Sequence, residues 1–281
     1  MTDRDGVLVT AEELMGRLAA GERPVLLDVR WRLDRPDGRA DHLAGHLPGA
    51  VYVSLEDELS DHTVTGRGRH PLPSGADLQS AARRWGISTD RPVIVYDDWN
   101  RAGSARAWWV LTAAGLTDVR ILDGGLAAWA AAGGALETGP VTPAAGDVVL
   151  VCSDLYAGIR PTLTADEAAG GAVATLLDAR APERFAGAVE PIDPVAGHIP
   201  GAVNLPSGAV LDADGRFRPV AEIEGLLADR GVEGSVGVYC GSGVTAAVVL
   251  AALAAASIEA ALFPGSWSQW SSETGRAVER D

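Results

Sequence analysis

Four short motifs occur twice along this 281-residue chain, and they follow the same order both times. The paired segments are residues 27–30 with 177–180, 45–51 with 197–203, 93–97 with 236–240, and 124–129 with 265–270. An ordered duplication of this kind indicates two domains of one fold. We therefore expect an N-terminal domain over residues 1–138 and a C-terminal domain over 148–281, joined by a Pro- and Gly-rich linker over 139–147.

Within each half, short apolar runs alternate with helical patterns. In the first half, residues 24–29 and 91–97 are typical of buried strands, whereas 76–85 and 104–114 have the apolar spacing of helices. This alternation predicts an α/β fold in which a mostly parallel sheet carries helices on both faces. Ligand sites in such folds lie beyond the carboxyl ends of the strands.

The composition argues against several classes of partner. A formal net charge of −15 and a pI near 4.7 disfavour binding to nucleic acid or to an anionic membrane surface. The two cysteines form neither a disulfide framework nor a zinc-binding spacing, so we expect no metal and no cofactor. The sequence opens without a signal-peptide pattern, and its longest apolar run, residues 246–256, is too short to span a bilayer. We therefore expect a cytoplasmic protein.

An apolar strand in the second half ends at a cysteine. Cys240 is followed by a turn that contains Gly241 and Gly243, and an alanine-rich helix begins near Thr245. We expect both glycines to take positive φ and to turn backbone N–H groups inward, where the helix N-terminus adds further donors. These donors favour the thiolate form of Cys240, which makes it a nucleophile. The alternative is an inert buried cysteine, the role that we assign to Cys152.

The loop Cys-Gly-Ser-Gly-Val-Thr-Ala at residues 240–246 resembles that of the tandem-domain rhodaneses, which are sulfurtransferases. It is most similar to the loop of 3-mercaptopyruvate sulfurtransferases, because vertebrate-type thiosulfate sulfurtransferases carry basic residues where this chain has Gly241 and Ser242. Cysteine phosphatases of similar fold need an arginine where this chain has Ala246. The resemblance implies that Cys240 takes sulfur from a small anionic donor, with 3-mercaptopyruvate favoured. The resulting persulfide would pass its sulfur to cyanide or to a thiol acceptor such as thioredoxin or a small thiol.

The same resemblance assigns roles to further residues. Ser242 would donate a hydrogen bond to the donor, and Arg184 matches the family's substrate arginine, whose planar fork suits a carboxylate. His46 matches a histidine proposed to act in proton transfer with the serine and an aspartate, for which spacing leaves three candidates: Asp34, Asp37 and Asp41. The backbone of the loop would stabilise charge on the transferred sulfur, through Gly241, Gly243, Val244 and Thr245.

The two halves differ at the cysteine position. Asp97 stands in the first half where the second has Cys240, and the turn over residues 98–103 lacks the glycine pattern of the cradle. The first domain is therefore expected to be catalytically silent and to contribute side chains to a cleft between the domains. His46 and His198 occupy the same turn in both halves, so their first role is expected to be architectural, with a ring nitrogen bound to backbone.

One departure from the family bears on the donor. Animal mercaptopyruvate enzymes carry a second arginine after a Glu-Pro pair, whereas this chain has Ile192 at that place. Thiosulfate therefore stays an alternative donor. A non-catalytic sulfur-relay or binding module is the alternative from another class, because rhodanese-like domains are also used in that way. The intact cysteine loop favours an enzyme.

Overall fold

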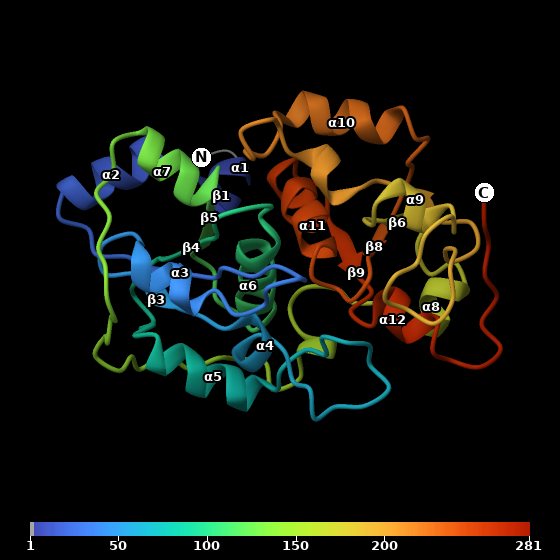
Figure 1. Cartoon of the computed structure of the whole chain (residues 1–281), viewed down its shortest axis with the longest axis horizontal. Helices are drawn as coiled ribbons and strands as arrows, with labels where there is room; N and C mark the ends of the chain where they lie inside the picture. The colour runs from blue at the N-terminus through green and yellow to red at the C-terminus, as the bar shows by residue number, and fades with distance from the viewer. Residues whose placement is uncertain (1–2) are drawn as a thin grey trace.

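The computed structural model describes residues 3–281 and contains two parallel sheets, one from each half of the chain (Figure 1). The strand order is β1-β5-β4-β2-β3 in the first sheet and β7-β6-β8-β9 in the second. The strands are β1 (Leu8–Val9), β2 (Val25–Asp28), β3 (Val51–Tyr52), β4 (Val93–Tyr96), β5 (Val119–Leu122), β6 (Thr175–Asp178), β7 (Val203–Asn204), β8 (Val236–Tyr239) and β9 (Ala260–Leu262).

Helices connect the strands in both halves, which confirms the predicted α/β fold class. The strands and helices predicted in the first half occur as β2, β4, α5 and α6, with ends shifted by one to two residues. No helix among residues 3–281 is long and apolar enough to cross a membrane. The helices are α1 (Asp3–Val7), α2 (Ala11–Ala19), α3 (Arg39–Ala44), α4 (Leu55–Glu58), α5 (Gly75–Arg84), α6 (Ala102–Ala113), α7 (Gly125–Ala131), α8 (Ala165–Ala169), α9 (Pro182–Phe185), α10 (Val220–Ala228), α11 (Ala246–Ala255) and α12 (Ser266–Trp270), with 3₁₀ turns η1 (Leu155–Ala157) and η2 (Ser207–Val210).

The duplicated motifs brace the two sheets in the same way. At the end of β6, Asp178 accepts from the Nε of Arg180 at 3.0 Å, and the two side chains form a buried ion pair. Tyr239, at the end of β8, accepts from the backbone N–H of Ile199 and so holds the turn that contains His198. His198 Nδ1 lies 2.9 Å from the Phe185 carbonyl, which confirms its architectural role. Equivalent contacts in the first half involve Asp28, Arg30, Tyr96, Leu47 and His46.

The two halves meet through α6 and α11, which lie side by side at the centre of the molecule (Figure 1). Both helices are apolar on almost every side, as expected of helices enclosed by protein. Their side chains join one continuous hydrophobic core that draws on both sheets, with Trp108 and Trp109 fully buried in it. This packing brings the N-terminal end of α11, and the loop before it, against the first half of the chain.

Candidate active site

Cys240 lies directly after β8, in the loop that leads to α11. Its side chain is buried, and the backbone N–H of Gly243 donates to its Sγ at 3.2 Å. Gly243 has φ +79°, and an added Cβ would lie 2.5 Å from the Pro264 carbonyl oxygen, so only glycine fits there. Helix α12 fixes the other side of the loop, because the Trp267 and Ser268 N–H groups donate to the carbonyls of Cys240 and Gly241.

The prediction of a positive φ at Gly241 is wrong, since residue 243 is the loop glycine with that conformation. Gly241 is needed instead for space. A Cβ at this position would lie 3.2 Å from Arg69 Nη2 and 3.5 Å from Arg184 Nη1. The missing side chain therefore leaves room beside the cysteine for a small group in contact with two guanidinium groups.

A cavity of about 240 Å³ opens over the loop between the two halves. The second half contributes four predicted residues that line it alongside Cys240, namely Gly241, Ser242, Val244 and Thr245, and also Arg184 from α9. Gly243 contacts the sulfur without lining the cavity. The first half contributes Trp31, Leu33, Arg69, Trp99 and Asn100. The cavity therefore forms the interdomain cleft expected from the sequence.

A chain of three polar side chains leads away from the nucleophile loop. Ser242 Oγ lies 2.7 Å from Nδ1 of His70, whose Nε2 lies 3.1 Å from a Glu56 carboxylate oxygen. Burial raises the pKa of Glu56, but hydrogen bonds from His70 and Trp31 outweigh burial and hold its pKa at about 2. The ionised carboxylate accepts the Nε2 proton, so Nδ1 is left to accept the proton of the serine hydroxyl. Burial lowers the pKa of His70 below its ordinary 6.5, against the opposing effect of Glu56, so its ring is neutral at pH 7.

The prediction that His46 acts with Ser242 is wrong. His46 is fully buried, its Nδ1 lies 2.7 Å from the His42 carbonyl, and its ring stacks on that of His42. It is therefore held inside the first half. His70 takes the place at the serine, and its acidic partner is Glu56 rather than one of the three candidate aspartates.

Sequence reasoning missed His70 because it lies in the segment between α4 and α5, which has no regular pattern. A signal was present nonetheless. His46 has a counterpart in the second half, where His198 is the sole histidine, so His42, His62 and His70 have none. A histidine without a counterpart in a duplicated chain is not required by the shared architecture.

Arg106 of α6 fastens the segment that carries His70 to the cysteine loop. Its side chain is fully buried and donates to the carbonyls of Leu59, His70 and Gly243 at 3.0 to 3.3 Å. Burial lowers the pKa of Arg106 to about 10, so the guanidinium stays charged at neutral pH. One arginine thus holds His70, the partner of Ser242, in a fixed position relative to the cysteine loop.

Arg184 and Arg69 approach the cavity from opposite halves of the chain. Arg184 Nη2 lies 2.7 Å from Glu190 and 3.2 Å from Asp193. Arg69 Nη1 also pairs with Asp193, so one carboxylate joins the two guanidinium groups. Ile192 is exposed and provides no charge here.

The loop of the first half that corresponds to the cysteine loop is occupied by its own carboxylate. Asp97 accepts from the backbone N–H of Ser104 at 3.0 Å and from its hydroxyl at 2.7 Å, and it pairs with Arg101 at 2.9 Å. An internal anion therefore fills the place where the second half has its sulfur.

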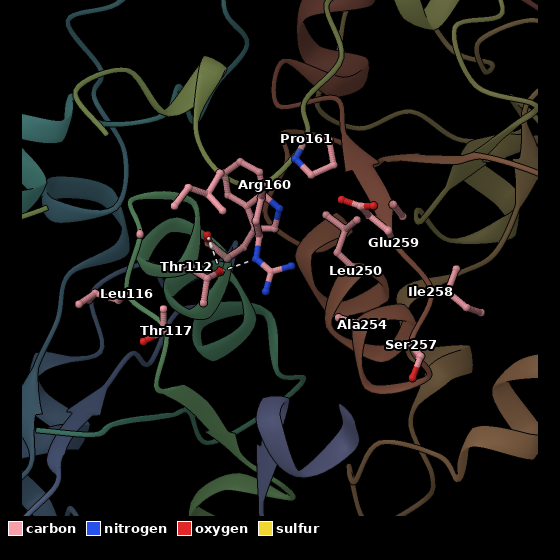
Figure 2. A pocket seen from close by; sticks show the side chains of 14 residues that line it. Thr112, Leu116, Thr117, Arg160, Pro161, Leu250, Ala254, Ser257, Ile258 and Glu259 are labelled. Carbon is pink, nitrogen blue, oxygen red and sulfur yellow. Dashed lines mark hydrogen bonds between the residues drawn. The ribbon is translucent and has the colours of Figure 1, made fainter. Parts of the chain in front are cut away.

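A second pocket, of about 460 Å³, lies between the carboxyl-terminal ends of α6 and α11 (Figure 2). Arg160 projects into it and donates to the Thr112 hydroxyl (Figure 2). The Arg160 guanidinium also stacks over the Trp108 ring, with 4.0 Å to the ring centroid. Its lining contains neither cysteine nor histidine. Cys240 lies at the opposite end of α11.

Comparison with known proteins agrees with this geometry. A family model for the rhodanese-like domain matches residues 10–132 and again residues 162–273. The chain belongs to the rhodanese family. It consists of two rhodanese domains and is a sulfurtransferase.

Three relatives illustrate the range of donors named within the family. A Mycobacterium tuberculosis protein named "Putative thiosulfate sulfurtransferase SseB" is 65% identical over 100% of this chain and 99% of its own. A Pseudomonas aeruginosa protein named "Probable 3-mercaptopyruvate sulfurtransferase" is 43% identical over 96% of this chain and 97% of its own. The crystal structure of SseA from Escherichia coli, described as a 3-mercaptopyruvate sulfotransferase, superposes with a TM-score of 0.80 at 34% identity, covering 93% of this chain and 98% of that one.

Proposed function

We propose that this protein transfers sulfur from 3-mercaptopyruvate to a thiol acceptor through a persulfide on Cys240. The observation that carries the proposal is the chain from Ser242 through His70 to Glu56. 3-Mercaptopyruvate holds its transferable sulfur as a thiol, so a proton must leave that sulfur and a carbon atom must gain one. A hydroxyl beside the nucleophile, bonded to a neutral histidine, provides the required acid–base chemistry.

The first half-reaction forms a sulfur–sulfur bond and breaks a carbon–sulfur bond. The Cys240 thiolate attacks the donor sulfur, and the electron pair of the carbon–sulfur bond leaves as the enolate of pyruvate. The thiol proton moves through the Ser242 hydroxyl and His70 and ends on the methyl carbon of pyruvate. Arg184 binds the carboxylate. The backbone N–H groups of Gly241, Gly243, Val244 and Thr245 stabilise charge on the bound sulfur.

The second half-reaction restores the enzyme. An acceptor thiolate attacks the outer sulfur of the persulfide, and the Cys240 thiolate leaves. Thioredoxin or a small thiol is the proposed acceptor. The first domain, residues 1–138, is proposed to be catalytically silent in the sense that Asp97 fills its cradle and it holds no nucleophile. Its His70 and Glu56 would instead serve the second domain, residues 148–281, which is proposed to be catalytic. A cytoplasmic location stays a prediction from the sequence.

Thiosulfate is the second candidate donor. Attack on its outer sulfur expels sulfite, which needs no proton transfer. Two guanidinium groups beside Gly241 favour a dianion of this kind, and the Mycobacterium tuberculosis relative is named for thiosulfate.

Steady-state transfer from the two donors to one thiol, measured in parallel, tests the proposal. We expect kcat/KM to be at least about tenfold higher for 3-mercaptopyruvate, equivalent to about 1.4 kcal/mol of transition-state stabilisation. Cys240→Ser serves as the control and should abolish transfer from both donors while the circular dichroism spectrum is unchanged. A higher kcat/KM for thiosulfate would contradict the proposal and make thiosulfate the assigned donor. A persulfide on Cys240 without turnover of either donor would indicate a sulfur relay.

A further inference from the structure

We propose that Arg69, which belongs to the first domain, is a second anion-binding residue of the active site and contacts the acidic group of the sulfur donor together with Arg184. The inference rests on the proposed function in one respect, namely that the donor binds beside Cys240. It assigns to the domain that holds no nucleophile a direct part in donor binding.

The free edges of the two arginines point to one place. Nη1 of Arg69 pairs with Asp193, whereas its Nη2 lies 3.2 Å from the position that a Gly241 Cβ would occupy. Arg184 uses Nε and Nη2 for Glu190 and Asp193, whereas its Nη1 lies 3.5 Å from the same position. No hydrogen bond within residues 3–281 occupies either of these two facing nitrogens.

Arg69 also has an unsatisfied hydrogen-bond donor. Its Nε is buried and has no partner among residues 3–281. A guanidinium binds a carboxylate or sulfonate best through two adjacent nitrogens, and the Nε and Nη2 of Arg69 form such an edge. An oxyanion at this edge would be adjacent to Gly241, the residue that follows the nucleophile, and within the cavity that both arginines line.

Asp193 explains how the two cations are held in place without a ligand. Its side chain is almost fully buried and contacts Arg69 and Arg184 at once. The carboxylate orders both guanidinium groups and compensates part of their charge, while the facing nitrogens stay free for the donor. Removing Asp193 should therefore favour an incoming anion, and removing Arg69 should disfavour it.

A purely structural role makes a different prediction. If Arg69 only tied the two domains together through Asp193, then Arg69→Gln and Asp193→Asn would break the same ion pair and change anion binding in the same direction. The two variants therefore separate anion binding from interdomain bracing.

Protection of Cys240 against alkylation provides a test that needs no turnover. Enzyme freed of persulfide with cyanide is treated with iodoacetamide over a range of sulfite concentrations, and the sulfite concentration that halves the alkylation rate is compared among variants. Arg67→Gln is the matched control, because Arg67 lies two residues away, is exposed, and stacks on Tyr156 outside the cavity. Thermal unfolding of each variant verifies that it is folded.

We expect Arg69→Gln to raise this sulfite concentration at least tenfold, Arg67→Gln to change it less than twofold, and Asp193→Asn to lower it. In turnover, Arg69→Gln should raise KM for thiosulfate more than KM for 3-mercaptopyruvate, because thiosulfate carries the greater charge. Equal effects of Arg69→Gln and Asp193→Asn, or of Arg69→Gln and Arg67→Gln, would overturn the inference. So would a wild-type enzyme that sulfite does not protect. Failure of the wild type to use 3-mercaptopyruvate would instead contradict the proposed function and leave the sulfite result decisive for Arg69.

Discussion

Replacing Ser242 with alanine is expected to separate the two candidate donors. The hydroxyl joins the cysteine loop directly to the ring of His70, with 2.7 Å between Oγ and Nδ1. Transfer from 3-mercaptopyruvate requires a proton to move, and a positioned acid–base group contributes about 10²- to 10⁴-fold to such a step. Transfer from thiosulfate releases sulfite without proton transfer. We therefore expect kcat/KM to fall by about 10²- to 10⁴-fold with 3-mercaptopyruvate and by less than about tenfold with thiosulfate.

The matching variant on the histidine should behave in the same way. His70→Gln removes the proton acceptor, whereas His62→Gln is the control, because His62 contacts the same Glu56 carboxylate at 2.9 Å but not the serine. The Ser242→Ala variant also leaves the buried Nδ1 of His70 without its hydrogen-bond partner, which should lower the free energy of unfolding by about 1 to 3 kcal/mol. Pyruvate release is followed with lactate dehydrogenase, sulfite release by ion chromatography, and unfolding with urea. An equal loss of activity with both donors would refute the assignment of a proton-transfer role to this chain.

Two further results are expected from the acidic and basic partners. Because the pKa of Glu56 is held at about 2 against an ordinary 4.5, its contribution to stability is present above pH 4.5 and lost as the pH falls from 4.5 toward 2. The free energies of unfolding of wild type and Glu56→Gln, measured with urea, should thus differ most above pH 4.5. If both free energies changed equally with pH between 4.5 and 2, this reasoning would be wrong. Arg184→Ala should mainly raise KM for either donor, because we expect Arg184 to bind the acidic group equally strongly in the ground and transition states. A loss confined to kcat in steady-state assays would show that Arg184 binds the acidic group only in the transition state.

The nucleophile loop and the duplication were accessible from the sequence because both are local. A strand, a cysteine, two glycines and a helix follow one another between residues 236 and 255, and each imposes its own conformational preference on the chain. The paired motifs likewise predicted two sheets of parallel strands, since each motif repeats the same strand end and turn. Even here the local argument was incomplete, because Gly241 proved to be required for space and not for its φ.

The partners of the loop depended on tertiary structure. Glu56, Arg69 and His70 lie in a stretch of the first half with little regular structure, and Ser242 follows His70 by 172 residues. Spacing cannot predict such contacts, and the family resemblance was applied to His46, whose motif recurs for architectural reasons. The packing of two apolar helices, α6 on α11, decides which part of the first domain faces the cysteine. The sequence by itself thus determined the fold and pointed to Cys240 as the nucleophile. The docking of one domain on the other decided which histidine meets Ser242 and which arginine of the first domain lies near Arg184, because side chains far apart in the chain meet only when that interface forms.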